Sequence, residues 1–358
     1  MCMYTRNTVP TIAHQDIPVL KYLDQKGDRF ETPYQNTPVE FGKKMVAQPE
    51  ATTNWNQSCG DHYGRQIYSI GAGVIHARMV PTENIAVHCK KAIIPKGTEF
   101  WMDPFGNDIA AKAMIITDES VDTDNWVIPD VLIQLILKSA PERNGIHVGD
   151  YQLTDDSFVS PSKDLPKAKV RGQVCGFYKD GSPIICGLER LEATWDKDCR
   201  KLGKQYSSYE EAWQTFNGRE VTAEYRKQYA DDKGFEAFHV CSSYREGCDE
   251  DWFFGAFGEV VAMLDNSLYL NAARAVTGLG YYITNDHWYW SCSEYDGLGS
   301  FFCYLYGCMV YRGWDYKYCR GSVVPFFASR REKKKTTRVT KSKISQYATR
   351  LCNFFKGH

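Results

Sequence analysis

The stretch YWSCSEYDGLGSFFCYLYGCMVYRGWDYKYCRGSVVPFF, residues 289–327, decides how the rest of the chain is interpreted. Its glycines and aromatic residues fit no helical period, so it predicts short strands joined by tight turns. Side chains alternate along a strand, which sends one set inward (Phe301, Cys303, Leu305) and an aromatic set outward (Phe302, Tyr304, Tyr306). Contiguous exposed aromatic side chains lower solubility unless they bind a partner, so the outward set predicts a recognition surface.

The composition is that of a folded chain with room for two domains. It has 358 residues, of which 43% are hydrophobic and 24% charged, so two domains could each bury a core. Its 23 tyrosines exceed what cores usually need. Tyrosine joins a large apolar area to a polar tip at low entropic cost, so this excess also favours recognition surfaces.

The cysteines and the N-terminus exclude several classes of protein. Thirteen cysteines, none in a CxxC motif, argue against a closed disulfide framework and against a zinc ribbon. We therefore expect mostly free thiols, with no metal and no cofactor. The first residues lack the apolar core of a secretory signal and no run is long enough to span a membrane, so we expect synthesis in the cytoplasm.

Residues 1–120 predict a mostly β module for attachment or assembly. Short β-branched and aromatic segments alternate with turn signals such as PKG and DPFGN. The segments DIPVLKYL and IPKGTEFWMDPFGNDIAAKAMIIT look similar to a small β module at the start of several bacterial and phage proteins. His62, His76 and His88 have no metal-ligand spacing, so they are interpreted as ordinary strand or surface histidines.

A connecting segment and a basic tail flank the second domain. Residues 121–146 predict a linker with one helix after Pro129, which could pack on either neighbouring domain. Residues 330–358 contain ten Lys or Arg and one Glu, which gives this tail a charge of about +9 and leaves about −10 for the rest. Its last part predicts a short amphipathic helix that docks on a partner, with nonspecific nucleic-acid binding as the alternative.

Residues 147–329 carry four motifs in order: VGDY, WFFGAFGEVVAML, YWSCSEY and VVPFFA. The series resembles C-type-lectin-like domains close to the formylglycine-generating-enzyme fold. The chain departs from that pattern at Gly255, Cys292 and Val324, where the family has proline, serine and arginine. The resemblance implies an α+β fold, a mostly β N-terminal module followed by a C-type-lectin-like α+β domain. It also implies five scaffold residues: Trp252, Glu259, Trp290, Glu294 and Pro325.

The aromatic stretch resembles the variable segment of proteins rewritten by diversity-generating retroelements. Between residues 295 and 323 only Met309, Trp314 and Lys317 lie outside the residues that such rewriting produces. The resemblance implies a hypervariable ligand-binding surface on a phage tail fibre or receptor-binding protein, with a bacterial cell-surface adhesin as the alternative. The implied ligand-binding residues are Cys292, Asp296, Leu298, Phe302, Tyr304, Tyr306, Cys308, Tyr311, Arg312, Asp315, Tyr316, Tyr318, Cys319 and Arg320.

The resemblance to retroelement-diversified proteins also implies partners and a location. The ligand would be a host surface protein or glycan, and the N-terminal module or basic tail would contact other proteins of the virion or surface structure. The chain would lie in a phage tail or on a cell surface, without a membrane span and as a possible homotrimer. We expect a binding protein and not an enzyme.

Two other classes of function remain open at this point. An oxidase of the formylglycine-generating type would need a reactive cysteine pair among Cys303, Cys308 and Cys319. A catalytic role for Glu259 or Glu294 competes with a structural one. A calcium lectin would need clustered carboxylates and amides, to which Asn285 and Asp286 are the nearest approximation.

Overall fold

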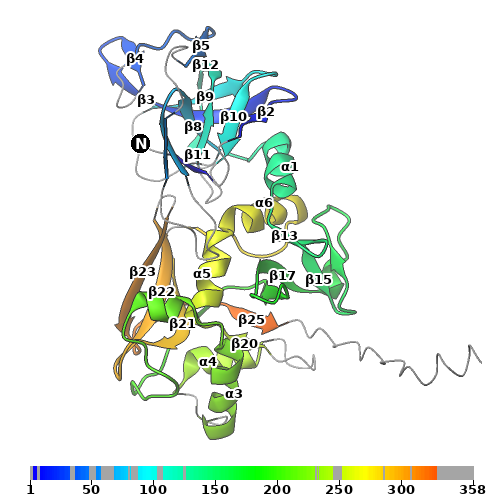
Figure 1. Cartoon of the computed structure of the whole chain (residues 1–358), viewed down its shortest axis with the longest axis vertical. Coiled ribbons are helices and arrows are strands. Elements are labelled where there is room, and N and C mark those ends of the chain that lie inside the picture. Colours follow the sequence, from blue (N-terminus) through cyan, green and yellow to red (C-terminus); the bar gives the residue numbers. More distant parts are fainter. Residues whose placement is uncertain are drawn as a thin grey trace, which may run out of the picture. The chain divides into compact units, whose positions relative to one another are not determined.

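The structure is a computed structural model, and its described residues all belong to one compact unit, Met1–Ala328 (Figure 1). They are residues 3–5, 9–32, 37–47, 54–57, 68–79, 81, 88–102, 108–123, 126–229, 232, 234–244, 252–284, 287–306 and 309–328. The basic tail, residues 330–358, lies outside them, as do His62, Asn285 and Asp286.

The N-terminal region forms two antiparallel sheets. A nine-stranded sheet has eight strands in the order β2 (Thr11–Ile12), β10 (Glu99–Met102), β11 (Asp108–Ala111), β8 (Ile75–Arg78), β3 (Ile17–Lys26), β9 (His88–Ile94), β12 (Ala113–Ser120) and β5 (Lys44–Val46). The ninth, β4 (Arg29–Glu31), pairs with β3. The smaller sheet has the order β1 (Met3–Thr5), β7 (Tyr68–Ala72) and β6 (Asn54–Gln57). The described part of residues 1–120 contains no helix, in agreement with the mostly β prediction.

The predicted connecting helix is α1, Asp130–Lys138, with Pro129 as its N-cap. Its apolar stripe is buried at Leu132, Ile133 and Ile136. The helix packs against α6 (Ser267–Thr277). After it, β13 (Glu142–Arg143) and β14 (Ile146–His147) form a short hairpin.

Two further sheets and five α-helices follow in the described residues, together with a short 3-10 helix, Lys167–Lys169. The first sheet has the order β16 (Phe158–Val159), β15 (Tyr151–Leu153), β17 (Val170–Phe177), β18 (Pro183–Cys186), β25 (Pro325–Ala328) and β20 (Phe253–Phe254). The second has the order β19 (Leu191–Thr194), β24 (Arg320–Val323), β21 (Trp288–Glu294), β22 (Gly299–Tyr306) and β23 (Met309–Tyr316). The helices are α2 (Tyr209–Trp213), α3 (Gly218–Tyr229), α4 (Glu236–Ser242), α5 (Phe257–Asp265) and α6.

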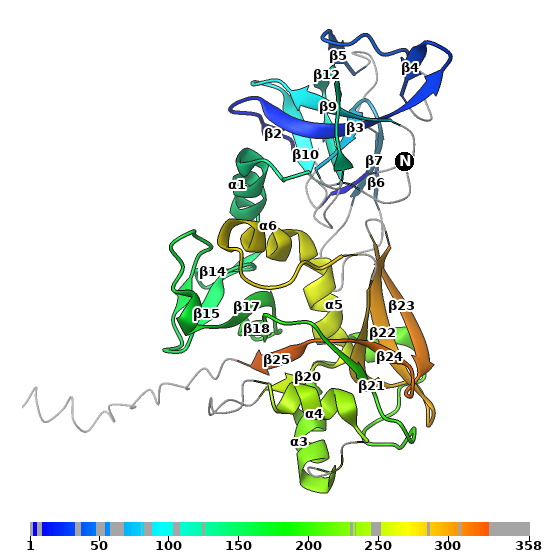
Figure 2. The ribbon, with the colours of Figure 1, turned by 180° about the vertical axis from the view of Figure 1, so that it is seen from behind.

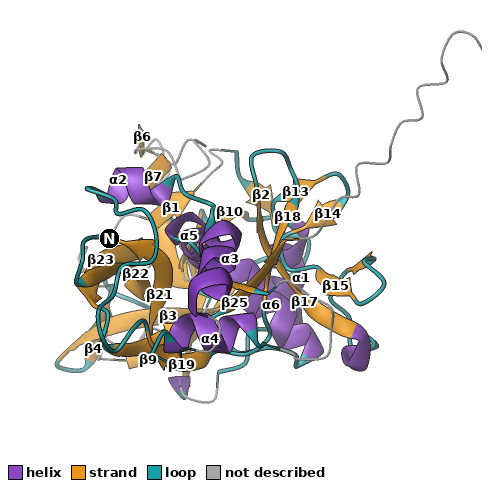
Figure 3. Ribbon diagram, turned by 90° about the horizontal axis from the view of Figure 1, so that it is seen from below, coloured by secondary structure: helices purple, strands orange, loops and turns teal. Residues whose placement is uncertain are grey.

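Helix α5 forms the centre of this region. All nine of its residues are buried, as expected for a helix that is apolar on every side. It contacts β17 of the first sheet and β21, β22 and β23 of the second. Figures 2 and 3 show it between the strands of these two sheets. Helix α5 therefore covers one face of the hairpin β22–β23.

The architecture is mixed α and β, as predicted from the sequence, with sheets predominating. It does not show a specific lectin fold. Among the described residues, no helix has the length and apolar character needed to cross a membrane.

Candidate binding surface

The hairpin β22–β23 has one buried and one open face. Phe301, Cys303 and Leu305 are buried, and Phe301 contacts Phe257 of α5 with ring centroids 5.1 Å apart. Their neighbours Phe302 and Tyr304 point to the opposite face and are only half-buried. This alternation is the one expected from a strand with period two.

The open face carries four adjoining aromatic rings, Trp288, Phe302, Tyr304 and Tyr311, which we call the aromatic ladder. Centroid distances are 5.0 Å from Trp288 to Phe302, 6.1 Å from Phe302 to Tyr304 and 5.5 Å from Tyr304 to Tyr311. Trp288, Phe302 and Tyr304 are half-buried, and Tyr311 is 43% exposed. Trp290 is buried at the inner end and contacts Trp288 at 4.8 Å. The ladder therefore extends the hydrophobic core onto the surface.

Two glycines allow the inner rings of the ladder to lie close to the sheet. A Cβ atom on Gly313 would lie 2.5 Å from the ring of Phe302, and one on Gly321 would lie 2.9 Å from the ring of Trp288. Any side chain at these positions would displace the rings. The rings of Phe302 and Trp288 therefore rest on glycine backbone.

A second aromatic group, the edge stack, follows the outer strand and its turn. Tyr295 stacks on Trp314 at 4.9 Å, Trp314 meets Tyr316 edge-on at 6.1 Å, and Tyr316 stacks on Tyr318 at 5.3 Å. Trp314, Tyr316 and Tyr318 are each at least 40% exposed. Leu298, in the turn before β22, is also exposed.

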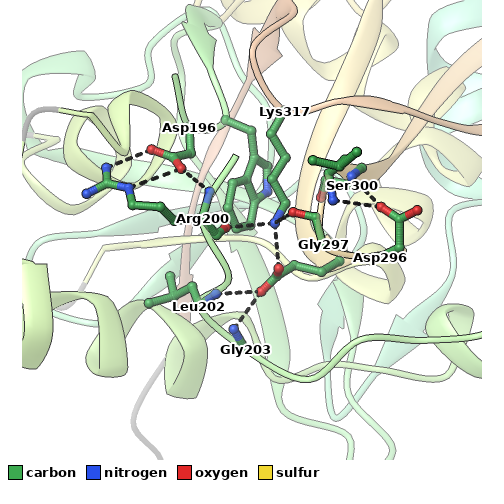
Figure 4. Close-up of polar contacts among 12 residues, drawn as sticks. Asp196, Arg200, Leu202, Gly203, Asp296, Gly297, Ser300 and Lys317 are labelled. Atoms are coloured by element: carbon green, nitrogen blue, oxygen red, sulfur yellow. Dashed lines mark hydrogen bonds and ion pairs between the residues drawn. The ribbon is translucent and has the colours of Figure 1, made fainter. Parts of the chain in front are cut away.

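A fully buried ion pair between Lys317 and Glu294 holds the turns beneath the edge stack. The Lys317 Nζ lies 2.6 Å from Glu294 Oε2 and also donates to the Arg200 carbonyl at 2.8 Å. Glu294 Oε1 accepts the backbone N–H groups of Leu202 and Gly203 at 2.9 and 2.6 Å (Figure 4). This pair therefore joins β21, the β23–β24 turn and the loop of residues 200–203.

Two aspartates stabilise the same turns. Asp296 Oδ1 accepts the backbone N–H groups of Leu298 and Gly299 at 2.8 and 2.7 Å (Figure 4). Asp196 is buried and pairs with Arg200, and this carboxylate together with Asp232 raises the pKa of the arginine. Asp296, predicted as a ligand contact, thus has a turn-forming role in the structure.

The remaining predicted ligand-binding residues fall in several different environments. Phe302, Tyr304 and Tyr311 belong to the ladder, and Tyr316, Tyr318 and Leu298 lie at the edge stack. Arg312 stacks on Trp213 at 3.3 Å, Asp315 bonds the backbone N–H of Tyr316, and Arg320 donates to the Glu192 carbonyl. Cys292 is buried in the core and Cys319 is half-buried. Tyr306 is placed only as a residue of β22, and Cys308 lies outside the described residues.

The predicted scaffold residues are interior. Trp252, Trp290, Glu259 and Glu294 are all buried. Glu259 accepts the Ala256 backbone N–H at 2.6 Å and the Tyr178 hydroxyl at 3.0 Å, and its burial raises its pKa to about 8. Pro325 begins β25 and pairs with Phe254. Glu259 therefore caps the first turn of its own helix.

Sequence reasoning did not assign Trp288, Trp314 or Tyr295 to a surface. Trp314 lies opposite buried Phe301 in the strand pairing, so period two alone predicts that it is buried. It is exposed because β23 is the last strand of its sheet. The high density of aromatic residues in residues 289–327 is the sequence feature that could have indicated surface positions for these three side chains.

The described residues offer little for metal or thiol chemistry. They contain no group of three or more His, Cys, Asp or Glu side chains placed to hold a metal ion. Burial raises the pKa of the thiols of Cys292, Cys303 and Cys319, so they are protonated near neutral pH and are poor nucleophiles.

Comparison with known proteins corrects the family assignment. No family model matches the chain, and no curated protein matches it. A crystal structure of a fimbrial protein from Bacteroides ovatus is similar with a TM-score of 0.41 and 14% identity, over 89% of this chain and 95% of that one. The prediction of a retroelement-diversified C-type-lectin-like variable protein is therefore wrong, and so are the phage tail-fibre function and the virion location that depended on it.

Proposed function

We propose that the chain is a bacterial cell-surface adhesin that binds a protein or glycan of another surface through the aromatic ladder. The observation that carries this proposal is the ladder itself, four adjoining rings on the open face of the β22–β23 hairpin. Three of these rings are half-buried and Tyr311 is exposed, and contiguous apolar surface of this kind often marks a site where a partner binds. Tyrosine and tryptophan also supply most of the energy in many protein interfaces.

The inner part of the ladder is held ready for binding. Phe302 and Trp288 rest on Gly313 and Gly321, and the backbone around the hairpin is fixed by the buried pair of Lys317 and Glu294. A ligand would gain contact with these rings without having to order them first. In this proposal the N-terminal β region and the basic tail contact other components of the surface structure.

The same features favour binding over catalysis, and we include the absence of enzyme activity in the proposal. The two glutamates considered as catalytic groups are both buried and bonded to backbone N–H groups. The described cysteines of the stretch have raised pKa values caused by burial. Catalysis would instead require an exposed group with a pKa suited to proton transfer or nucleophilic attack.

The proposal is tested by replacing the outer rings of the ladder. The parent chain and the double variant Tyr304→Ala with Tyr311→Ala are each labelled with a fluorophore. Both are titrated onto intact cells, and the bound fluorescence gives the affinity of each. Two interfacial tyrosines together should cost at least about 1.4 kcal/mol, which is about tenfold in affinity. Tyr282→Ala is the matched control, because Tyr282 is 51% exposed and lies outside the ladder.

Two outcomes decide the test. Loss of cell binding in the double variant, with an unchanged melting temperature and normal binding by the control, supports the proposal. Equal binding by the double variant and the parent chain would rule out the ladder as the adhesive surface. Treating the cells with proteases or glycosidases beforehand then separates a protein ligand from a glycan.

A further inference from the structure

Two buried thiols outside the aromatic stretch lie next to each other on paired strands. Cys175 belongs to β17 and Cys186 to β18, and neither side chain is exposed. The register shifts between Val174 and Gly176, which leaves Cys175 as the extra residue of a β-bulge. The two thiols are in hydrogen-bond contact with each other. Two cysteines can be bridged without a large backbone movement only when they are adjacent in this way.

The pair lies beside a buried cation. Arg274 of α6 is 1% exposed and donates to Gln173 Oε1 at 2.9 Å and to the Tyr281 carbonyl. Its Nη2 lies 4.0 Å from Cys186 Sγ. Among the residues that the structure describes, no carboxylate lies within ion-pair distance of this guanidinium. A buried charge is costly without an anion beside it, and Cys186 is the contacting group that can supply one near neutral pH.

The two thiols differ in how readily they ionise. The hydrogen bond from Cys175 and the charge of Arg274 outweigh burial and lower the pKa of the Cys186 thiol. Burial and the contact with Cys186 raise the pKa of the Cys175 thiol. Cys241 is equally buried, and burial alone acts on its thiol and raises its pKa. Since the thiolate is the form that reacts with oxidants, Cys186 is the more reactive member of the pair.

A hollow in the surface lies close to this cluster. Leu188, Gly280 and Tyr281 contribute to its lining. Gly280 also borders the arginine, because a Cβ atom at this position would lie 3.0 Å from Arg274 Nε. Only backbone covers Arg274 at this point, so a small local opening would admit a molecule of the size of hydrogen peroxide.

We propose that Cys175 and Cys186 form an oxidation site, at which hydrogen peroxide converts the two thiols into a disulfide that links β17 to β18. The Cys186 thiolate attacks one peroxide oxygen, the O–O bond breaks, and hydroxide leaves and takes up a proton. Cys175 Sγ then attacks the sulfur of the resulting sulfenic acid, and the S–O bond breaks. The hydroxyl leaves as water with the proton of the Cys175 thiol. The two sulfurs lose two electrons, which reduce the peroxide to two waters.

The location of the pair suits a chain that is exposed to oxidants. Disulfides form and persist at cell surfaces and outside cells, where no reducing pool maintains free thiols. The oxidation site does not depend on the adhesin proposal, because neither thiol belongs to the aromatic ladder. Failure of the cell-binding test would therefore leave the oxidation site untouched, and the reverse also holds.

Peroxide treatment of the full parent chain tests the site with an internal control. The reduced chain is exposed to hydrogen peroxide for increasing times, quenched with catalase, denatured, alkylated and digested with trypsin, which cuts at Lys179 between the two cysteines. Mass spectrometry without reduction should show a peptide pair linked through Cys175 and Cys186. Free thiol should disappear at Cys186 at least about tenfold faster than at Cys241, because each unit of pKa changes the thiolate fraction about tenfold.

Two single variants separate the roles of the thiols. Cys175→Ala removes the second thiol, so peroxide should leave a sulfenic acid at Cys186 that dimedone traps. Cys186→Ala should leave Cys175 without a dimedone adduct, because its thiol is protonated. Circular dichroism and the melting temperature establish that each variant is folded, and the result for the parent chain stands without them.

Four results would each overturn the proposal. They are equal rates of thiol loss at Cys186 and Cys241, a disulfide from either member of the pair to a third cysteine as the main product, equal trapping at the remaining thiol in both variants, and no link between Cys175 and Cys186 after the half-buried Cys199 and Cys319 have been oxidised.

Discussion

Removing the charge of Lys317 should destabilise the chain far more than removing an exposed lysine with the same ion-pair distance. Lys317 and Glu294 are both fully buried with 2.6 Å between Nζ and Oε2. In Lys317→Met the carboxylate keeps its two backbone donors, Leu202 and Gly203, but has no cation. A buried charge left without its partner costs about 3–5 kcal/mol. At about 2–4 °C per kcal/mol, the melting temperature should fall by roughly 10 °C.

The matched control is Lys204→Met. Lys204 also lies 2.6 Å from its partner, Glu211, but the two side chains are 64% and 39% exposed. Exposed pairs contribute about 0–1 kcal/mol, so this variant should unfold at nearly the parental urea concentration. Urea titration followed by tryptophan fluorescence gives the free energy of unfolding for each variant.

The double variant Lys317→Met with Glu294→Gln decides whether the two residues act as a pair. Glutamine keeps a carbonyl oxygen for the N–H groups of Leu202 and Gly203, so only the charge is lost. The double variant should be more stable than the sum of the two single losses by about 2 kcal/mol or more. Strictly additive losses, or equal losses for Lys317→Met and Lys204→Met, would refute the reasoning from burial.

Two further predictions concern the core and the ladder. The pKa of Glu259 is raised to about 8, so the folded chain holds a proton that the unfolded chain releases above about pH 4.5. The free energy of unfolding should therefore fall by about 3–5 kcal/mol from pH 4.5 to pH 8, and Glu259→Gln should remove this part of the slope in urea titrations. In Gly313→Ala the new methyl would lie 2.5 Å from the ring of Phe302; stability should fall by about 1–3 kcal/mol and cell binding should weaken, while Gly297→Ala, which would contact only the end of Lys201, should change neither.

Local periodicity predicted the strand content but not the environment of individual residues. Period two along residues 301–305 gave the correct inner and outer faces, because those side chains alternate within one strand. Cys292 also lies in a predicted strand of this stretch and was predicted to contact the ligand, yet its side chain is buried. Its strand, β21, lies between β22 and β24 and has core on both faces. Strand order depends on long-range pairing, which no local pattern encodes.

The contacts that organise the candidate surface are also long-range. Glu294 binds backbone groups that precede it by 91 and 92 residues, and its ion pair with Lys317 spans 23 residues. The sequence indicates that a lysine and a glutamate are present, but not that both are buried together. The exposure of Trp314 has the same origin, since only the sheet order makes β23 an edge.

The residues that carried the family resemblance explain why it misled the functional prediction. Trp252, Glu259, Trp290 and Glu294 are all buried, and each glutamate is bonded to backbone within the fold. Motifs built from such residues report how helices and strands pack, and similar packing can support unrelated functions. The surface that bears on function consists instead of half-buried and exposed rings whose neighbours are set by strand order. A functional assignment for this chain must therefore rest on the aromatic ladder, which the cell-binding experiment tests.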